Sequence, residues 1–506
     1  MSGANIERIV VLGGGTAGWM AAAVLAKALG RDVSVTVVSS GEVGTVGVGE
    51  ATIPQIRHLH AFLGLDEASV LREANATYKL GIAFEGWRTP GHRYIHAFGE
   101  LGLPLGLAPF HHYHLRGVAL GEEARIWDYS LTAKAAFAER YAPLDRIGDT
   151  RLGGIVAAFH LDASRYAAML RRRAEQDGAR HVEGRFEDAE RHPQTGAVTA
   201  LRLSGGRRIE GDLFVDCSGF ASLLLGGVEG VPFEDWSDHL PCDSAVVVQS
   251  TASAAKRPYT QAMARKAGWQ WRIPLQTRCG NGHVYSSGHI SDDEAANTLL
   301  ETLEGEPLTE PRLIRFRTGT RARAWQGNVV GLGLAAGFME PLESTSIHLV
   351  QSAVERLVAA FPSRAMEPAL RDAFNRRTRT EWERVRDFLV LHYHVNGRCG
   401  EPFWDERRGA AVPESLARRL ALFRAGARFF REDDELFAEP GWVQVMLGQG
   451  VEPQGWAPAA EALDAGRLRR ILTDARTLVA RTVQSLPTHQ IALQRALGSG
   501  ASLETV

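Results

Sequence analysis

Near its start the chain has a short run at residues 8–12 that is entirely aliphatic after the charged Arg8, followed by a stretch of small residues at about 17–29 that favours a helix. Gly30 separates this stretch from a second, β-branched run at 33–38. Continuous apolar runs of this kind are typical of strands buried on both faces, and a strand–helix–strand order is what a parallel sheet requires. The N-terminal pattern therefore predicts an α/β fold.

The pattern changes from strands to helices near residue 367. Short apolar runs predict strands at 198–203, 213–216, 245–250, 269–273, 283–287 and 328–332. Apolar positions at helical spacing, with Arg, Glu and Asp between them, predict helices at 368–393, 413–431 and 459–484. We therefore expect two parts. Residues 1–367 form an α/β region with an added β-sheet layer that holds the cofactor and active sites, and residues 368–506 form a mainly helical region that covers the substrate site.

Composition and charge narrow the class of protein. At 506 residues the chain exceeds one ordinary core, and 45% hydrophobic and 23% charged residues are typical of a globular protein. A net charge of −2 gives no electrostatic reason to expect nucleic acid or a membrane as a partner, and no apolar run reaches the roughly 18 residues of a membrane span. The four cysteines form no C-x-x-C pair, and the histidine-rich segments 111–114 and 392–394 lack matching carboxylates. We expect a soluble cytoplasmic protein without a metal site or a disulfide framework.

The segment between the first expected strand and helix has the spacing Gly13-x-Gly15-x-x-Gly18. In this context the spacing is a dinucleotide fingerprint: the first glycine makes a tight turn, the second lets a pyrophosphate approach the backbone, and the third packs the helix against the strand. An acidic residue normally ends the second strand and holds the ribose, but here that residue is Ser39, with Glu42 three residues further on. A serine hydroxyl bonds a ribose more weakly than a carboxylate does, so the ribose contact is the open part of this prediction.

Two later segments favour a flavin over a nicotinamide. Residues 212–219 run from an aliphatic strand into Asp-x-x-Gly, and residues 328–337 form a second strand-to-glycine turn that is expected to open a helix. Both resemble the later FAD motifs of glutathione-reductase-type flavoproteins, although two unrelated strand–turn units would look similar. The chain has one Gly-x-Gly-x-x-Gly, so no separate NAD(P)H domain is indicated and the flavin would have to arrive already reduced.

Residues 269–274 read Trp-Gln-Trp-Arg-Ile-Pro. Side chains alternate along a strand, so Trp269 and Trp271 fall on the same face, and Pro274 ends the pairing because it lacks a backbone donor. Two indoles on one face are either core packing, which is the commoner role of large aromatic residues, or the wall of a site. The dinucleotide fingerprint, together with Lys79 and Glu343, favours the wall.

Four segments of the chain resemble flavin-dependent halogenases, which place chlorine or bromine on indoles and related electron-rich rings. They are residues 47–54, 77–87 around Lys79, 269–274, and 337–347 around Glu343. The resemblance extends over most of the chain. It implies an FAD-binding, glutathione-reductase-like (Rossmann-type) domain with an added β-sheet layer and a helical C-terminal part.

The resemblance also implies a reaction. Reduced flavin and O2 convert a halide into hypohalous acid, Lys79 presents this oxidant to the substrate, and Glu343 stabilises the positive charge on the ring and removes its proton. FADH2 would come from a separate flavin reductase, and the substrate would be a small indole-type molecule. The implied site residues are Gly13, Gly15, Thr16, Ala17, Gly18, Ser39, Glu50, Ala51, Leu334 and Ile347 for FAD; Thr345 and Ser346 for the halide; His96, Phe98 and Ser344 for the substrate pocket; and Trp269 and Trp271 between flavin and substrate.

The chain departs from the tryptophan halogenases at two places. Ser346 stands where those enzymes usually have glycine, and we expect bromide to be favoured over chloride for this reason. Residues 441–450 lack the tyrosine pair that grips the amino acid in tryptophan halogenases, so we expect poor activity on free tryptophan and a preference for free indole or bulkier indole-type compounds.

Two other functions remain open from the sequence. A single-component FAD aromatic hydroxylase would use the same fold but would bind NAD(P)H on the same chain. A flavin-binding or redox-sensing protein would have no substrate, and Lys79 and Glu343 would then be structural. The exposed faces of the expected helices also allow a homodimer.

Overall fold

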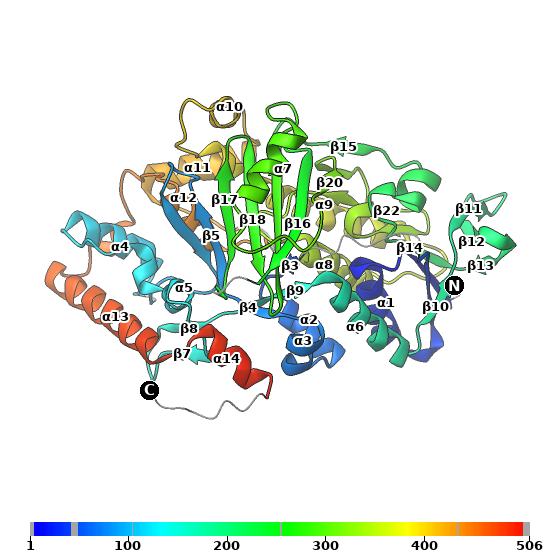
Figure 1. The fold of residues 1–506 in the computed structure, drawn as a ribbon, viewed down its shortest axis with the longest axis horizontal. Helices are drawn as coiled ribbons and strands as arrows, with labels where there is room; N and C mark the ends of the chain where they lie inside the picture. The colour runs from blue at the N-terminus through cyan, green and yellow to red at the C-terminus, as the bar shows by residue number, and fades with distance from the viewer. Residues whose placement is uncertain (1–4, 42–48, 104, 253–255, 433–434, 499–506) are drawn as a thin grey trace. The chain divides into compact units, whose positions relative to one another are not determined.

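The structure, a computed structural model, describes residues 5–41, 49–103, 105–252, 256–432 and 435–498 (Figure 1). The chain forms two compact units, each built from three separate segments. Unit 1 comprises Met1–Asn75, Leu161–Asp243 and Arg315–Glu383, and unit 2 comprises Ala76–His160, Ser244–Ile314 and Arg384–Val506. Each unit therefore folds from segments that lie far apart in the sequence.

Unit 1 is built around a six-stranded sheet with the order β10-β2-β1-β14-β23-β22. The first five of these strands run parallel, and β22 is antiparallel to β23. Ile9 and Val10 of β1, whose side chains point to opposite faces of the sheet, are both buried, as the apolar run predicted for a strand covered on both faces. The strands are β1 (Arg8–Leu12), β2 (Ser34–Ser39), β10 (Arg180–Glu183), β14 (Leu213–Asp216), β22 (Trp325–Gln326) and β23 (Val329–Gly331).

Helix α1 (Thr16–Leu29) connects β1 to β2 and packs against α6 (Ala163–Gln176) and α8 (Ser346–Ala359). The three alanines at 21–23 in α1 are fully buried, and such small side chains allow helices to pack closely. Helix α6 begins after Asp162, whose carboxylate accepts hydrogen bonds from the first backbone N–H groups. The remaining elements of this unit are α2 (Ile56–Leu63), α3 (Glu67–Glu73), β3 (Gly49–Ala51), the sheet of β11 (Phe186–Arg191), β12 (Val198–Leu203) and β13 (Arg208–Glu210), and the sheet of β15 (Phe233–Asp235), β21 (Gly319–Arg321) and β24 (Gly337–Phe338).

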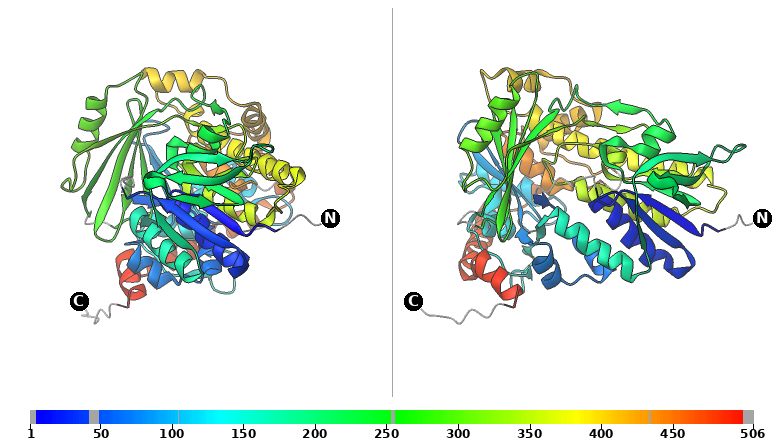
Figure 2. Two further views of the ribbon diagram at one scale, coloured as in Figure 1. Left: turned by 90° about the vertical axis from the view of Figure 1, so that its right-hand side faces the viewer. Right: turned by 45° about the vertical axis from the view of Figure 1, so that its right-hand side comes forward.

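Unit 2 contains a seven-stranded sheet with the order β20-β16-β19-β18-β17-β5-β6, seen as neighbouring strands in Figures 1 and 2. Helix α7 packs against β19, and α12 packs against β6 at the sheet edge. A short antiparallel pair joins β4 (Thr77–Lys79) to β9 (Ala158–Asp162). The sheet strands are β5 (Gly81–Glu85), β6 (Arg93–Ala97), β16 (Ser244–Thr251), β17 (Thr260–Arg265), β18 (Gly268–Pro274), β19 (Arg278–Tyr285) and β20 (Arg312–Arg315), and β7 (Leu144–Arg146) pairs with β8 (Gly153–Ile155).

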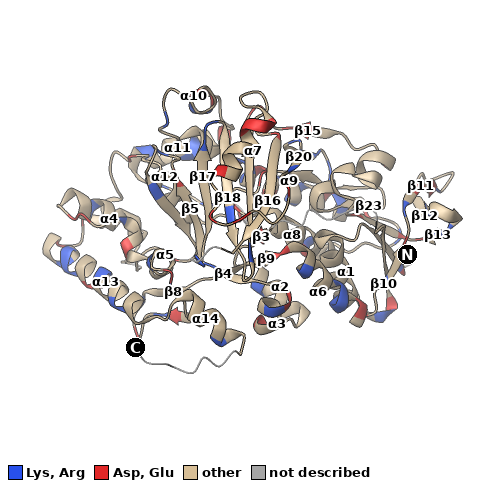
Figure 3. Ribbon diagram, in the orientation of Figure 1, with Lys and Arg blue, Asp and Glu red and all other residues tan. Residues whose placement is uncertain are grey.

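Helices make up the described chain after residue 367. They are α9 (Pro368–His394), α10 (Pro402–Gly409), α11 (Glu414–Gly426), α12 (Glu439–Gly448), α13 (Ala465–Ser485) and α14 (His489–Ala496). Earlier helices of unit 2 are α4 (Phe110–Ala119), α5 (Leu131–Phe137) and α7 (Asp292–Glu301). None of the helices in the described residues is long and apolar enough to cross a lipid bilayer. Acidic and basic residues are interspersed along the elements (Figure 3).

The mixed α/β fold confirms the predicted fold class at this level, but several predicted boundaries are wrong. The strand expected at 283–287 is β19, Arg278–Tyr285, because the Gly-Asn-Gly at 280–282 lies buried inside the sheet and does not form a turn. The helix expected at 413–431 ends at Gly426, where Ala427 takes a left-handed φ of 57°. The helix expected at 459–484 begins only at Ala465, after the capping carboxylate of Asp464. Residues 42–48, which include Glu42 and the start of one segment with family resemblance, lie outside the described residues.

Candidate active site

The turn between β1 and α1 has the shape that its glycines predict. Gly13 has a φ of 121°, and a Cβ atom there would lie 2.1 Å from the carbonyl oxygen of Cys217 in the neighbouring strand connection. A Cβ atom at Gly18 would lie 1.9 Å from the carbonyl oxygen of Gly13, so the helix packs directly on the turn. At Gly15, by contrast, no atom of the described residues lies within 4 Å of the Cβ position, apart from Gly15 and its immediate chain neighbours. The turn therefore offers open space beside backbone N–H groups at a helix start, which fits a dinucleotide pyrophosphate.

The turn after β14 is held together by a buried carboxylate. Asp216 is fully buried and accepts hydrogen bonds from the backbone N–H and the hydroxyl of Ser218, at 3.0 and 2.6 Å. Its other oxygen accepts from the backbone N–H groups of Leu224 and Leu225, both at 2.8 Å. The Asp-x-x-Gly motif thus shapes its own turn through four hydrogen bonds.

The turn after β23 meets the dinucleotide turn. The expected helix here is a single 3-10 turn, Gly333–Ala335, with Leu334 37% exposed at its surface. A Cβ atom at Gly333 would lie 3.1 Å from Cβ of Ala17 in α1 and 3.3 Å from Val350 Cγ2 in α8. The structure thus brings together the starts of two helices and the predicted flavin-contacting turn, although they lie far apart in sequence.

Residues 343–347 lead into α8 and include its first two residues. Glu343 is 2% exposed, and Ser344 occupies a left-handed conformation (φ 59°) that closes a turn onto the carbonyl of Pro341 at 3.1 Å. Thr345 precedes the helix, which begins at Ser346. The first N–H groups of a helix have no acceptor within the helix and carry its positive dipole end, so this start suits the predicted halide. Buried Glu343 thus lies two residues before that helix cap.

Glu50 lies in β3 beside Ala51 and is partly buried. Burial raises the pKa of its carboxyl from 4.5 to about 7. A carboxyl group with this pKa is partly protonated near neutral pH, so it is able to donate as well as accept a hydrogen bond. This suits the predicted place beside a cofactor.

Lys79 is fully buried at the end of β4, whereas a lysine is ordinarily exposed. Its ammonium lies 5.2 Å from the centre of the Phe98 ring, which follows β6. The hydroxyl of Thr77, two residues earlier on β4, donates to the carbonyl oxygen of Pro274 at 2.7 Å and so ties β4 to the end of β18. The catalytic candidate therefore sits on a strand fixed at the end of the tryptophan strand.

His160 is a buried neighbour of Lys79 that the sequence did not indicate. Its Nδ1 lies 3.1 Å from the Thr77 hydroxyl and its Nε2 lies 3.0 Å from the Thr260 hydroxyl. The Thr77 hydroxyl donates its proton to the Pro274 carbonyl, so toward His160 it acts as an acceptor. Nδ1 of His160 therefore donates to Thr77, and Nε2 accepts from the Thr260 hydroxyl. Burial, helped by the Lys79 ammonium, holds the pKa of His160 well below 6.5. His160 is therefore neutral beside the cation of Lys79.

Trp269 and Trp271 lie on one face of β18, as predicted, with ring centres 6.0 Å apart and side chains 1% and 7% exposed. The Trp271 ring lies over Gly282 of β19, where a Cβ atom would be 2.1 Å from Cζ2. Gly282 thus makes room for the second indole. The glycines at 280 and 282 could have indicated in the sequence that a large ring packs over this strand. The Trp271 indole N–H is buried and has no hydrogen-bond partner among the described residues.

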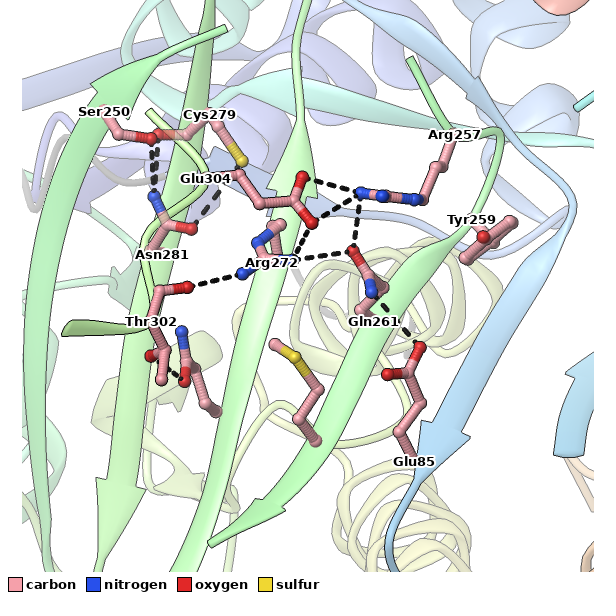
Figure 4. Close-up of polar contacts among 12 residues, drawn as sticks. Glu85, Ser250, Arg257, Tyr259, Gln261, Arg272, Cys279, Asn281, Thr302 and Glu304 are labelled. Atoms are coloured by element: carbon pink, nitrogen blue, oxygen red, sulfur yellow. Dashed lines mark hydrogen bonds and ion pairs between the residues drawn. The ribbon is translucent and has the colours of Figure 1, made fainter. Parts of the chain in front are cut away.

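The opposite face of β18 carries a polar network (Figure 4). Arg272, 6% exposed, donates to the carbonyl of Thr302 at 2.7 Å and to Gln261 of β17 at 3.2 Å, and it forms an ion pair with Glu304. Glu304 also pairs with Arg257 at 2.7 Å, and Gln261 donates to Glu85 of β5 at 3.1 Å. The network joins β5, β17 and β18 to the segment after α7, so it fixes the strand whose other face carries the indoles.

His96 of β6 lies in an aromatic cluster that sequence reasoning missed. Its ring is 5.5 Å from Phe388 of α9 and 6.0 Å from Phe437. A Cβ atom at Gly441 of α12 would lie 2.8 Å from His96 Nε2, so α12 approaches this ring closely. The side-chain amide of Gln444 binds both the N–H and the carbonyl of Ala97, at 3.1 and 3.0 Å. Residues 441–450, which depart from the tryptophan halogenases, thus lie mostly in α12, which is anchored on the strand of His96.

The candidate residues form one set in each unit. Unit 1 holds the glycine turns, Ser39, Glu50, Ala51, Leu334 and residues 343–347, and unit 2 holds Lys79, His96, Phe98, Trp269 and Trp271. Within the described residues there is no group of three or more His, Cys, Asp or Glu side chains that could hold a metal ion. His111 and His114 bind backbone carbonyl oxygens of Ala427 and Ala124.

Comparisons with known proteins show the family of the chain. The sequence matches the model of the tryptophan halogenase family over residues 8–465. It is 38% identical over 445 residues to tryptophan 7-halogenase RebH of Lentzea aerocolonigenes, covering 84% of this chain and 83% of that protein. It is 36% identical over 490 residues to tryptophan 6-halogenase ThaL of Streptomyces albogriseolus, covering 90% and 91%.

Solved structures show the same likeness. Xcc4156, a flavin-dependent halogenase from Xanthomonas campestris, superposes with a TM-score of 0.94 at 45% identity, covering 98% of this chain and 100% of that one. BrvH, a flavin-dependent halogenase from Brevundimonas sp. BAL3, superposes with a TM-score of 0.94 at 44% identity, covering 97% and 99%. The chain belongs to the tryptophan halogenase family and is a flavin-dependent halogenase.

Proposed function

We propose that the chain is an FADH2- and O2-dependent halogenase that installs bromide or chloride on an electron-rich, indole-type ring, with the reduced flavin supplied by a separate reductase. The observation that carries this proposal is the fully buried Lys79, whose ammonium faces the Phe98 ring. Burying an ammonium is costly, so a buried lysine in a family of enzymes is a strong candidate for a functional group.

Unit 1 would bind FAD as a Rossmann-type domain. Gly13, Gly15 and Gly18 with Thr16 and Ala17 would hold the pyrophosphate, Ser39 would lie near the ribose, and Glu50, Ala51, Leu334 and Ile347 would contact the rest of the cofactor. When bound in its reduced form, the flavin supplies the chemistry by which O2 oxidises a halide to hypohalous acid. Thr345 and Ser346 would hold that halide against the N–H groups at the start of α8.

Lys79 would then present the oxidant. Its ammonium donates a hydrogen bond to the oxygen of hypohalous acid, which makes the halogen more electrophilic. The ring attacks the halogen as the halogen–oxygen bond breaks, and the departing oxygen takes a proton from the Lys79 ammonium and leaves as water. Glu343 stabilises the cationic ring and accepts the ring proton, which makes up for the proton that Lys79 gave. Because His160 is neutral, the positive charge of this pair is carried by the Lys79 ammonium.

The substrate would be enclosed by His96, Phe98 and Ser344, with Trp269 and Trp271 separating it from the flavin. RebH and ThaL are named for tryptophan, but we propose free indole or a larger indole-type compound for this chain. Helix α12 includes Trp442, Gln444 and Met446 and carries no tyrosine pair for an amino acid. We further propose that residues 368–506 cover the substrate site and that the protein acts in the cytoplasm.

Reconstitution tests this function. Purified protein receives FAD, a generic flavin reductase, NADH, bromide and a panel of indoles, and mass spectrometry detects products. We expect halogenated indoles, little product from free tryptophan, and no product without the reductase. Lys79→Met should abolish product while FAD still binds, and Lys134→Met, on a half-exposed lysine of α5, is the matched control. NADH oxidation and hydroxylated product without any reductase would instead select the single-component hydroxylase.

A further inference from the structure

The first observation concerns the end of β2, where dinucleotide-binding chains normally carry an acidic residue and this one carries Ser39. The Ser39 hydroxyl lies directly on the fingerprint turn, because a Cβ atom at Gly14 would be 2.6 Å from its oxygen. The same hydroxyl lies 2.9 Å from Nε2 of His181 on β10. Ser39 is therefore a half-buried polar group between the turn and the next strand outward.

The second observation is that β10 brings an acidic residue to the same level. β10 runs parallel to β2, and Glu183 is the register partner of Ser39. Paired residues point to the same face of a sheet, and alternate residues share a face, so Ser39, His181 and Glu183 all lie on one side. The backbone N–H of Gly184 donates to the Ser39 carbonyl at 3.0 Å and fixes this register.

The Glu183 carboxylate reaches past the end of β2. A Cβ atom at Gly41 would lie 3.2 Å from Glu183 Oε1, so this oxygen lies over the backbone two residues beyond Ser39. In the described part of the chain, no residue hydrogen-bonds or pairs with this exposed carboxylate. Its acceptor oxygens are thus available at the place where a ribose is held in dinucleotide folds.

His181 is positioned by its own neighbours. Its ring centre lies 5.7 Å from that of Trp19, a buried residue of α1, and the two rings are tilted by 56°. The guanidinium of Arg171 in α6 lies 5.3 Å from the centre of the Trp19 ring. Burial and the Arg171 charge lower the pKa of His181, while Glu183 and Glu175 raise it. A neutral imidazole in this place accepts or donates one hydrogen bond and adds no positive charge.

We propose that Glu183, with the Ser39 hydroxyl oriented by His181, binds the vicinal ribose hydroxyls of the adenosine half of the cofactor. The neighbouring strand thereby supplies the carboxylate that the end of β2 lacks. Two hydroxyl groups donate to one carboxylate, and such charge-assisted hydrogen bonds are stronger than those to a serine alone. This inference rests on the proposed FAD binding and adds the residues that recognise the ribose.

The test measures binding and needs no turnover. Apoprotein is titrated with FAD, and quenching of flavin fluorescence gives Kd for the natural chain, Glu183→Gln and Glu187→Gln. Glu187 is an exposed carboxylate on β11 and serves as the matched control. Loss of a charged partner to hydroxyl groups predicts an about tenfold weaker Kd for Glu183→Gln and no change for Glu187→Gln. Ser39→Asp combined with Glu183→Gln should restore most of the affinity.

Competition identifies the group that is recognised. ADP and 2′-deoxy-ADP displace FAD from the natural chain, and we expect ADP to be the better competitor. In Glu183→Gln this preference should shrink. An unchanged FAD Kd in Glu183→Gln, or an equal loss of affinity for ADP and 2′-deoxy-ADP, would overturn the inference while leaving FAD binding intact. Failure of the natural chain to bind FAD at all would overturn the proposed function as well.

Discussion

The ammonium of Lys79 lies 5.2 Å from the centre of the Phe98 ring, although β4 and the segment after β6 are separated by two strands and the turn between them. A cation over an aromatic face is attracted by the ring quadrupole, and the attraction grows when water is excluded. Lys79 is fully buried, so Phe98 is part of what makes an ammonium tolerable at this place. The pair joins the proposed oxidant-presenting group to the proposed substrate wall.

Replacing Phe98 should therefore weaken catalysis without weakening FAD binding. Phe98→Leu keeps an apolar side chain but removes the ring face, a loss of about 0.5–2 kcal/mol that corresponds to roughly a 2- to 30-fold lower kcat/KM. Steady-state bromination of indole measures the effect, and FAD titration is the control. An unchanged kcat/KM would show that the ring does not support Lys79.

The buried neutral histidines should make the protein less stable in acid. Burial lowers the pKa of His489 from 6.5 to about 4, and its Nδ1 donates to the Lys256 carbonyl at 2.6 Å. Between pH 6.5 and 4 this histidine is protonated in the unfolded chain but not in the folded chain. The free energy of unfolding therefore falls as the pH falls, by about 3 kcal/mol for this group. His489→Asn keeps the donor but removes the titration, so the pH slope of its unfolding free energy in urea should be shallower. His192→Asn, at an exposed histidine, is the control for the replacement of histidine by asparagine.

Glu50 should act in the opposite direction. Its folded pKa of about 7 exceeds the unfolded value of 4.5, so the folded chain holds the proton more tightly between these limits. The penalty for ionising it is absent below pH 4.5 and complete above pH 7, and it amounts to about 1–3 kcal/mol for a partly buried group. Glu50→Gln should thus stabilise apoprotein at pH 8 more than at pH 5, as measured by thermal and urea unfolding. Equal stabilisation at both values would contradict the raised pKa.

Disrupting the polar network on the face of β18 opposite the two tryptophans should lower the free energy of unfolding. Arg272 is buried and pairs with Glu304, so Arg272→Met removes one of the cations that pair with Glu304 and removes one donor to Gln261. Removing one partner of a buried ion pair typically costs about 3–5 kcal/mol, although the partial exposure of Glu304 lowers this toward about 2. Urea unfolding followed by tryptophan fluorescence measures the loss. Arg317→Met, at an exposed ion pair with Asp235, should change stability by less than about 1 kcal/mol.

Local patterns predicted those features of the fold that depend on residues close together in the sequence. The first strand, the glycine turn and the following helix were readable from residues 8–29, and two indoles at alternate positions predicted their shared face. Contacts between segments that are distant in the sequence give no such local pattern. That Lys79 is buried, that His160 lies beside it, and that Glu183 is level with Ser39 all depend on strand pairing between distant segments. Gly282 gave a signal that resembled a turn, since a glycine that admits a neighbouring ring and one that bends the chain look alike in sequence.

A single substitution at Ser346 should change the halide preference of the enzyme. Ser346 is the first residue of α8, partly buried, and stands where tryptophan halogenases usually have glycine. A side chain beside the helix N–H groups alters the space and the hydration of a bound anion, and bromide sheds water more readily than chloride. Ser346→Gly should therefore move the ratio of kcat/KM for bromide over chloride toward chloride by about tenfold, or 1.4 kcal/mol. Competition with both halides at equal concentration and mass spectrometry of the products measure this ratio, and Ser352→Gly, one and a half turns later on the same helix, is the control. Equal ratios in the natural chain and in Ser346→Gly would show that the hydroxymethyl group does not select the halide.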